Sequence, residues 1–297
     1  MSVASTTMSD LLTNAKSLFL RYQNTTLSKI KHWQRGVLSP MTTFPAMALL
    51  PVRESYIYEL SNHKYDVLRE FTVEIYDLKL GTSQSKDNTI ELIDATKEVL
   101  QSDRTISDSC YDSTWTNEIY GDSIDVTRGR LFYSSVNVVC RSRETFPTLI
   151  TSSTTNNDIK STTLQDIILS TIKSNKSTYY NTIQTIVDSP IKPISRFPAI
   201  ILGASRKVRN QTKPYADISK VYIDISVISQ LLPKETNLNW VLSNTEGVKD
   251  VLQANYSWGG YCDYSNVLDI VYDQRRSTSG YLYSNTITME CVVREYL

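Results

Sequence analysis

The sequence repeats itself, and this repeat limits the possible folds more than any other feature. The tripeptide Phe44-Pro45-Ala46 recurs as Phe197-Pro198-Ala199, and the run at 97–101 (KEVLQ) recurs at 249–253 (KDVLQ). Later matches follow in the same order and at nearly the same offset: Cys110 with Cys262, and 136–140 with 287–291. Collinear matches of this kind predict two copies of one structural unit.

The repeat predicts the domain boundaries. We expect a first domain at residues 1–144 and a second at residues 162–297, each of an ordinary domain size. The segment 145–161 between them is rich in Ser, Thr and Asn and poor in charge. Such a composition is typical of a linker.

Hydrophobic periodicity predicts the same elements in both copies. Each copy opens with a helical pattern, at 11–22 and 164–172, and Thr162 with Gln165 suggests a capping box. Each Phe-Pro-Ala then suits the start of an edge strand, because proline cannot donate to a ladder. Residues 71–76 and 221–227 alternate as a half-buried strand does. Further helices near 88–100 and 238–252 and a closing strand pair complete an α+β fold, in which helices pack on an antiparallel-rich sheet in each of two similar domains.

Composition and charge exclude several functions. The chain has 297 residues with 31 basic and 31 acidic side chains. Residues 1–155 hold 16 basic and 18 acidic side chains, so neither half is polarised enough to favour phosphate binding. We find no secretion signal and no apolar run long enough for a membrane span. The four cysteines show no C-x-x-C pair and are interpreted as small buried side chains.

Enzyme signatures are missing from the sequence. It lacks phosphate-binding loops, a dinucleotide fingerprint, a zinc-protease motif and a nucleophile elbow. The only histidines, His32 and His63, lie in the first copy, so no histidine-dependent site can be shared. Acidic pairs in loops are better explained as solvated surface than as metal or glycosidase carboxylates. We therefore predict no enzymatic activity, no cofactor and no metal.

Arginine and aromatic residues gather before the last strand of each copy. Because Arg, Tyr and Trp are favoured in protein interfaces, we predict contacts with other proteins there rather than with nucleic acid. A glycine-containing aromatic loop after the second copy's later helix is a further candidate docking patch. The candidate interface residues are Arg128, Arg130, Tyr133, Trp258, Tyr261, Arg275, Arg276 and Tyr281.

The order of these motifs resembles the tail terminator proteins of tailed bacteriophages. The resemblance covers about residues 8–144 and 162–297, and it rests on layout and on short motifs: the leading helix, the Phe-Pro-Ala strand, the helix ending in Val-Leu-Gln, the Arg-bearing hairpin and the final amphipathic strand. Ordinary members of that family resemble a single copy, so the tandem duplication is a departure.

The resemblance implies a structural virion protein that assembles in the host cytoplasm. Such a protein would form a ring, here a hexamer by preference over a trimer, that caps the tail tube and joins it to the head–tail connector. Its partners would be the tube protein, the sheath if the tail contracts, and neck proteins, while DNA passes through the lumen without specific binding. The alternatives are another neck or baseplate adaptor of the virion and, less favoured, a two-domain ligand-binding module.

Overall fold

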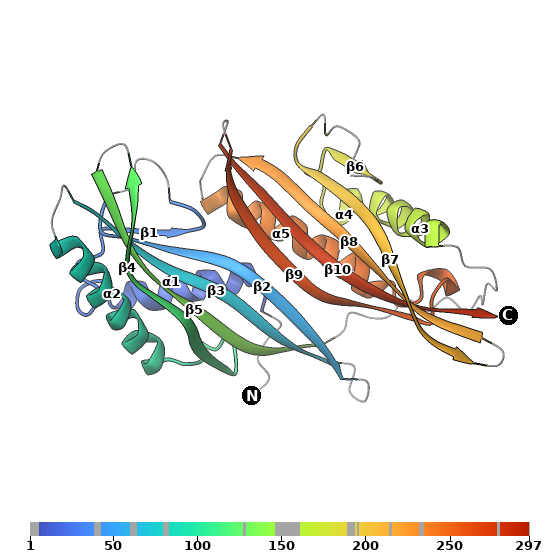
Figure 1. Ribbon diagram of the computed structural model, residues 1–297, viewed down its shortest axis with the longest axis horizontal. Helices are drawn as coiled ribbons and strands as arrows, with labels where there is room; N and C mark the ends of the chain where they lie inside the picture. Colours follow the sequence, from blue (N-terminus) through green and yellow to red (C-terminus); the bar gives the residue numbers. More distant parts are fainter. Residues whose placement is uncertain are drawn as a thin grey trace. The chain divides into compact units, whose positions relative to one another are not determined.

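Contacts divide the chain into two compact units (Figure 1). Unit 1 comprises Met1–Glu54, Asp66–Glu144 and Pro233–Asn239, and unit 2 comprises Ser55–Tyr65, Thr145–Leu232 and Trp240–Leu297. The computed structural model describes residues 6–38, 43–59, 64–79, 83–126, 129–145, 161–188, 194, 196–213, 216–231, 235–277 and 280–296.

Within its described residues, unit 1 contains two helices and five strands. Strand β1 pairs with β2, β2 lies next to β3, β3 next to β5, and β5 next to β4. Strands β2 and β3 enter this unit with residues 46–54 and 66–79. The elements are α1 (Met8–Arg21), β1 (His32–Arg35), β2 (Ala46–Glu59), β3 (Lys64–Lys79), α2 (Ser83–Ser102), β4 (Asp112–Val126) and β5 (Gly129–Thr145).

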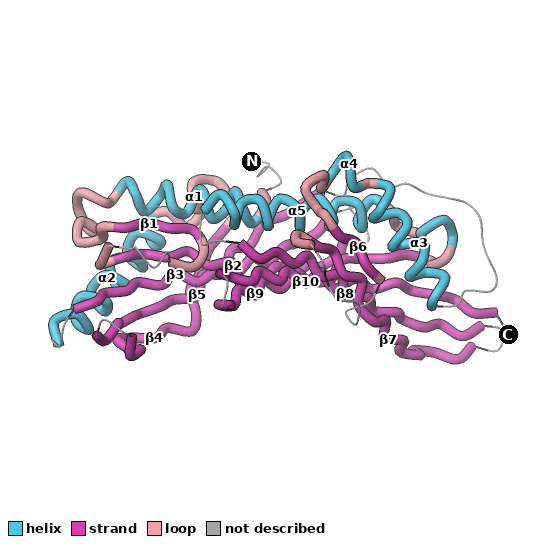
Figure 2. Tube along the Cα trace, turned by 90° about the horizontal axis from the view of Figure 1, so that it is seen from above, coloured by secondary structure: helices cyan, strands magenta, loops and turns pink. Residues whose placement is uncertain are grey.

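The described part of unit 2 contains three helices, one short 3-10 turn and five strands in the order β6-β7-β8-β10-β9. Helix α3 contacts β7 and β6, and Figure 2 shows it lying along the strands of this unit. The elements are α3 (Ser161–Ser174), α4 (Lys176–Tyr179), β6 (Thr185–Val187), β7 (Ala199–Lys213), β8 (Ala216–Leu231), α5 (Glu235–Ala254, in unit 2 from Trp240), η1 (Trp258–Gly260), β9 (Tyr264–Ser277) and β10 (Gly280–Tyr296).

The two units share one pattern of strand pairing. In each, a short first strand runs parallel to the second, and the others follow in the same order. The Phe44-Pro45 and Phe197-Pro198 peptide bonds are both cis. The predicted domains 1–144 and 162–297 differ from the units at residues 55–65 and 233–239, and nearly all of the predicted linker, residues 146–160, lies outside the described residues.

The predicted fold class is wrong. We expected an α+β fold of two similar domains with helices packed on antiparallel-rich sheets, but half of the structure is strand and less than a third is helix. The sheet of each unit is mixed, because β1 runs parallel to β2 in unit 1 and β6 parallel to β7 in unit 2. The strands are also longer than the alternating apolar runs: β3 spans 16 residues, and β5 and β10 span 17 each. Polar residues extend these strands, and apolar periodicity does not detect such extensions.

Two local predictions, the edge strands at Phe-Pro-Ala and the capping box at Thr162 and Gln165, were wrong because residues from other elements bind there. The Phe-Pro-Ala segments do not begin edge strands, because Ala46 pairs with His32 and Ala199 with Thr185 on neighbouring parallel strands. Helix α3 begins before Thr162, and Gln165 donates through Nε2 to the carbonyl oxygen of Gly203 at 3.2 Å instead of capping the helix.

The first helix has a capping box that the sequence pattern did not single out. Thr7 is its N-cap, the side chain of Thr7 accepts from the Asp10 amide, and the Asp10 carboxylate accepts from the Thr7 amide at 3.2 Å. This reciprocal pair satisfies two amides that a helix start would otherwise leave unbonded. The helix then buries one face, made of Met8, Leu11, Leu12, Ala15, Leu18 and Phe19.

Candidate assembly interface

The predicted interface residues lie on two hairpins and one loop. Arg130 and Tyr133 are on β5, Arg275 and Arg276 on β9, and Tyr281 on β10, while Trp258 and Tyr261 belong to η1 and the residue that follows it. Arg128 falls outside the described residues, and of Arg276 only the backbone is described.

The first hairpin, β4–β5, places Tyr133 against an acidic strand. Tyr133 is paired in register with Asp122, and its hydroxyl donates to Asp122 Oδ2 at 2.9 Å. This hydrogen bond is the main reason that the pKa of Tyr133 is raised. The Tyr133 ring also lies 6.0 Å from the ring of Tyr76, centroid to centroid. Arg130 is exposed and lies opposite Asp125 in the same ladder.

The second hairpin, β9–β10, also presents an exposed arginine. Arg275 Nε lies 2.6 Å from Asp273 Oδ2 on the same strand, and the Arg275 side chain is 77% exposed. An ion pair this open to solvent contributes at most about 1 kcal/mol to stability. Arg275 is paired in register with Leu282, and Arg276 with Tyr281. The hairpin therefore brings the predicted arginines and Tyr281 onto adjacent strands.

The aromatic loop is part of the core and not a docking patch at Trp258. The Trp258 side chain is buried, at 2% exposure, and its indole Nε1 donates to Ser265 Oγ at 2.9 Å. A buried indole needs such a partner because an unsatisfied donor is costly. Tyr261 is half-buried beside Gly259, whose positive φ of 70° turns the chain there. The pattern of aromatic residues and glycines that suggested a surface therefore belongs to a compact turn.

The sequence analysis missed several exposed large apolar side chains, and strand β4 carries four of them. Ile124 is 50% exposed and Ile119 43% exposed, and Tyr120 and Val126 are exposed as well. Large apolar side chains gathered on one strand are typical of a surface that another chain covers. Apolar residues alternate with polar ones within 119–126, so the sequence does predict a strand with one apolar face. Such a face is ordinarily assigned to the core, and its exposure was therefore not predicted.

Strand β4 is the outermost strand of unit 1. Among the described strands it pairs only with β5, and its register shifts between Thr116 and Ile119 and again between Ile119 and Asp122. Gly121 supports the second irregularity: its φ is +58°, and a Cβ there would come within 2.6 Å of the Lys86 side chain on α2. Such bulges at sheet edges re-aim side chains and interrupt the ladder.

A small polar network holds the middle of β4 against α2. The ammonium of Lys97 lies 2.8 Å from Asp94 and 3.0 Å from Glu118. Burial lowers the pKa of Lys97, but the surrounding oxygens outweigh this effect and the pKa lies above its usual value. Tyr120 donates to the Glu118 carboxylate, and this bond is the largest cause of a lowered Glu118 pKa. Helix α2 thus fixes one part of β4, while Ile124 stays exposed.

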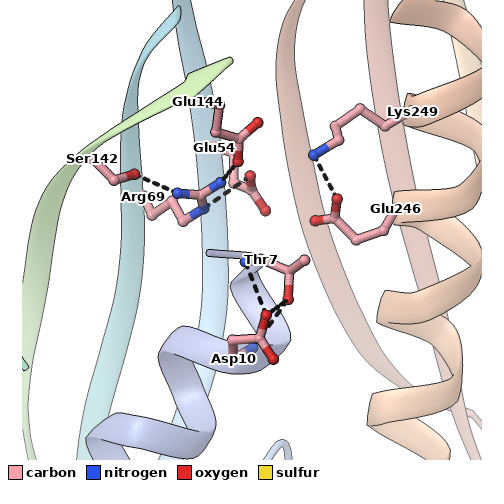
Figure 3. Close-up of polar contacts among 8 residues, drawn as sticks. All are labelled: Thr7, Asp10, Glu54, Arg69, Ser142, Glu144, Glu246 and Lys249. Atoms are coloured by element: carbon pink, nitrogen blue, oxygen red, sulfur yellow. Dashed lines mark hydrogen bonds and ion pairs between the residues drawn. The ribbon is translucent and has the colours of Figure 1, made fainter. Parts of the chain in front are cut away.

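A buried charged cluster ties three strands of unit 1 together (Figure 3). Arg69 on β3 donates to Glu54 on β2, with Nε 3.2 Å from Oε2, and also to Ser142 and Glu144 on β5. Arg69 is 1% exposed and Glu54 is fully buried. The guanidinium is suited to this position because its planar donors can serve several acceptors at once. In unit 2, a second buried pair joins Glu246 and Lys249 on α5 at 2.6 Å.

Each unit holds one pair of buried thiols. All four cysteines are free and buried, which confirms their interpretation as small core side chains. The neighbouring Cys110 thiol and burial raise the pKa of Cys140 well above its usual value, and Cys262 and burial do the same for Cys291. Thiols held in the neutral form are poor nucleophiles and poor metal ligands.

The described part of the chain contains no group of three His, Cys, Asp or Glu side chains placed to hold a metal ion. No helix within the described ranges is long and apolar enough to cross a membrane.

A hollow of about 240 Å³ lies beside β4 and is lined by Gln101, Arg104, Ser113, Thr114 and Trp115.

No protein-family model matches the chain, and no curated protein sequence matches it.

Proposed function

We propose that this protein is a structural subunit of a tailed-bacteriophage virion, a tail terminator that forms a ring on the tail tube and joins it to the head–tail connector. The observation that carries the assembly role is the outer strand β4, which exposes Ile119, Tyr120, Ile124 and Val126 on an edge without a second partner strand among the described residues. An apolar edge of this kind is a template for another polypeptide. The assignment to phage tails rests on the resemblance in the order of motifs.

The proposed mechanism is the closure of a growing polymer. A tube that elongates by adding equivalent rings always exposes one further binding surface. A terminator binds that surface and offers no equivalent one, so elongation stops and the opposite face receives the connector. The repeat suits this task, because two units with the same strand order but different loops can contact two different neighbours.

The proposal entails a defined assembly. We expect six chains in a ring and a lumen through which DNA passes without specific binding. The balanced charge, with 31 basic and 31 acidic side chains, agrees with such a lumen because DNA binding gains from an excess of positive charge.

Another neck or baseplate adaptor would use the same kind of edge, and the experiment below separates it from a terminator. A ligand-binding module is less favoured, because the aromatic loop that suggested it holds Trp258 in the core, where its Nε1 is occupied by Ser265.

The test is to remove the protein from assembling particles and to measure tail lengths by negative-stain electron microscopy. Tails longer than normal and without heads are expected, and adding back the wild-type protein should restore normal length. Headless tails of normal length would instead identify a neck adaptor, and particles that assemble normally would overturn the proposal. Mass photometry of the purified chain should show a ring of one size, with or without added tail tubes.

A matched pair of add-back variants connects this test to β4. Ile124→Lys places a charge on the exposed apolar edge, whereas Ser123→Lys changes an exposed polar neighbour. We expect Ile124→Lys to fail to restore tail length while its thermal unfolding stays close to wild type, and Ser123→Lys to restore at least part of the function.

A further inference from the structure

Two outer strands differ in the sign of their charged residues, although Asp112 and Glu118 on β4 are already paired with Arg104 and Lys97. Strand β4 contains four acidic residues and no basic one: Asp112, Glu118, Asp122 and Asp125. Strand β7 contains four basic residues and no acidic one: Arg206, Lys207, Arg209 and Lys213. This separation does not follow from the composition of the whole chain, in which acidic and basic residues are equal in number.

Most of β7 is an edge in the same sense as β4. Its neighbour β6 covers only the residues from Ala199 to Ile201, and β8 occupies the other side of β7 up to Lys213. The Gly203 carbonyl is used by Gln165, but within the described residues no strand follows β6 along the rest of that edge. Arg206, Lys207 and Val208 are exposed there.

The charges select which edges can meet. Charged edges normally protect sheets from pairing with one another, because like charges directly opposite each other are unfavourable. Two β4 edges would place acid against acid, and two β7 edges would place base against base. A β4 edge facing a β7 edge places the acidic residues Asp122 and Asp125 against basic residues of β7.

Apolar side chains are available on the same two edges. Val208 is exposed between the basic residues of β7, and Ile119 and Ile124 are exposed between the acidic residues of β4. Cross-strand pairs of β-branched side chains add to the stability of a sheet. Both edges therefore offer main-chain hydrogen-bonding groups, complementary charge and an apolar contact.

We propose that copies of this chain join head to tail, with the β4 edge of one copy pairing with the β7 edge of the next. The partner is a second copy of the chain. A contact between two different surfaces of identical subunits is heterologous and produces a ring when the rotation per subunit closes. This inference rests on the proposed ring-forming function and identifies the interface that builds the ring.

Charge exchange tests the pairing without loss of the fold. Asp122→Lys on β4 and Arg206→Glu on β7 should each abolish the oligomer measured by mass photometry. Mixing the two single variants should restore it, because each altered edge then meets its complement in the other chain. A chain carrying both substitutions should also assemble. Asp166→Lys and Lys173→Glu, at exposed positions on α3, are the matched controls and should leave the oligomer unchanged.

Cross-linking tests the direction of the contact. The native cysteines are buried, so thiols introduced as Ile119→Cys, Ile124→Cys and Val208→Cys can be addressed with a short bismaleimide. A β4 variant mixed with the β7 variant should give covalent dimers, whereas each variant alone should give none. Dimers from a single variant alone would indicate pairing of like edges and would overturn the proposal.

The two proposals can fail separately. If the wild-type chain forms rings and corrects tail length but both charge variants still assemble, the β4–β7 interface is wrong and the terminator function stands. If the charge variants behave as expected but tail length never depends on the protein, the interface stands and the terminator function is wrong. Circular dichroism and thermal unfolding of each variant exclude misfolding as the cause of lost assembly.

Discussion

The guanidinium of Arg69 on β3 lies 3.2 Å, Nε to Oε2, from the carboxylate of Glu54 on β2, and both side chains are almost completely buried. Glu144 on β5 receives a second bond from the same guanidinium. One cation therefore neutralises part of the charge of two carboxylates in the interior, where an unpaired charge is costly. A single side chain on β3 thus forms ionic contacts with residues on both neighbouring strands.

Arg69→Ala should destabilise the protein severely. The substitution removes the ion pairs of Arg69 with Glu54 and Glu144 from the interior, and breaking a buried pair in this way costs about 3–5 kcal/mol. Urea unfolding followed by circular dichroism measures the change. Arg275→Ala is the control, because Arg275 is exposed and should change stability by no more than about 0.5 kcal/mol. A loss below about 1 kcal/mol in Arg69→Ala would contradict the role of the cluster.

Asp66 should make unit 1 sensitive to acid. Arg141 donates to Asp66 at 2.7 Å and Arg143 at 2.9 Å, and the Arg141 bond is the main reason that the pKa of Asp66 is lowered. Because its pKa is lower in the folded state, Asp66 stabilises the fold above its ordinary pKa of about 3.9 and loses this contribution as the pH falls through the folded value. Below about pH 4, the free energy of unfolding should therefore fall less steeply with pH in Asp66→Asn than in wild type.

Thermal unfolding of wild type and Asp66→Asn between neutral pH and strong acid checks this prediction. The two curves should lie furthest apart at neutral pH and converge in acid. A constant separation at every pH would show that the side chain acts by packing alone. Asp166→Asn, at an exposed position on α3, provides the control.

Gly247→Ala should destabilise α5, although alanine usually favours a helix over glycine by about 1 kcal/mol. A Cβ at residue 247 would lie 2.6 Å from the carbonyl oxygen of Tyr179, which is too close for real atoms. The backbone of α4 or α5 must then shift. Ser243→Ala on an exposed face of α5 is the control and should be neutral or slightly stabilising. A stabilised Gly247→Ala variant would contradict the close approach.

Trp258→Phe should lower stability without affecting assembly. The substitution removes the indole donor to Ser265 and leaves that hydroxyl with one bond fewer, at a cost of about 1–3 kcal/mol. The side chain is buried, so the surface is unchanged. Urea unfolding measures the first effect and mass photometry the second. Loss of the oligomer in a folded Trp258→Phe variant would contradict this prediction and would indicate that Trp258 contributes to the interface.

Part of the structure was accessible from the sequence because it depends on local patterns. The apolar faces of α1 and α3 and the alternation in β3 and β8 follow from periods of 3.6 and 2 residues, which each segment carries by itself. The burial of the four cysteines followed from residue type. The repeated order of elements was visible because matching motifs recur along the chain.

Other features depend on which segments meet, and the sequence does not contain that information locally. The pairing of Ala46 with His32 and of Ala199 with Thr185 covers the first residues of the Phe-Pro-Ala strands, although proline suggested an open edge there. The same holds for Arg69, an arginine within an apolar alternation, whose burial is tolerable only because Glu54, Ser142 and Glu144 arrive from other strands.

The amino-acid sequence by itself determined the helical and strand periodicities, the repeat and the balance of charge. Tertiary structure alone decided the mixed sheet, the burial of Trp258 and the exposure of Ile119 and Ile124 on an outer strand. The physical reason is that burial is a property of the neighbours a residue acquires. An apolar side chain in a strand is core when another layer covers it and interface when none does, and the local sequence is the same in both cases.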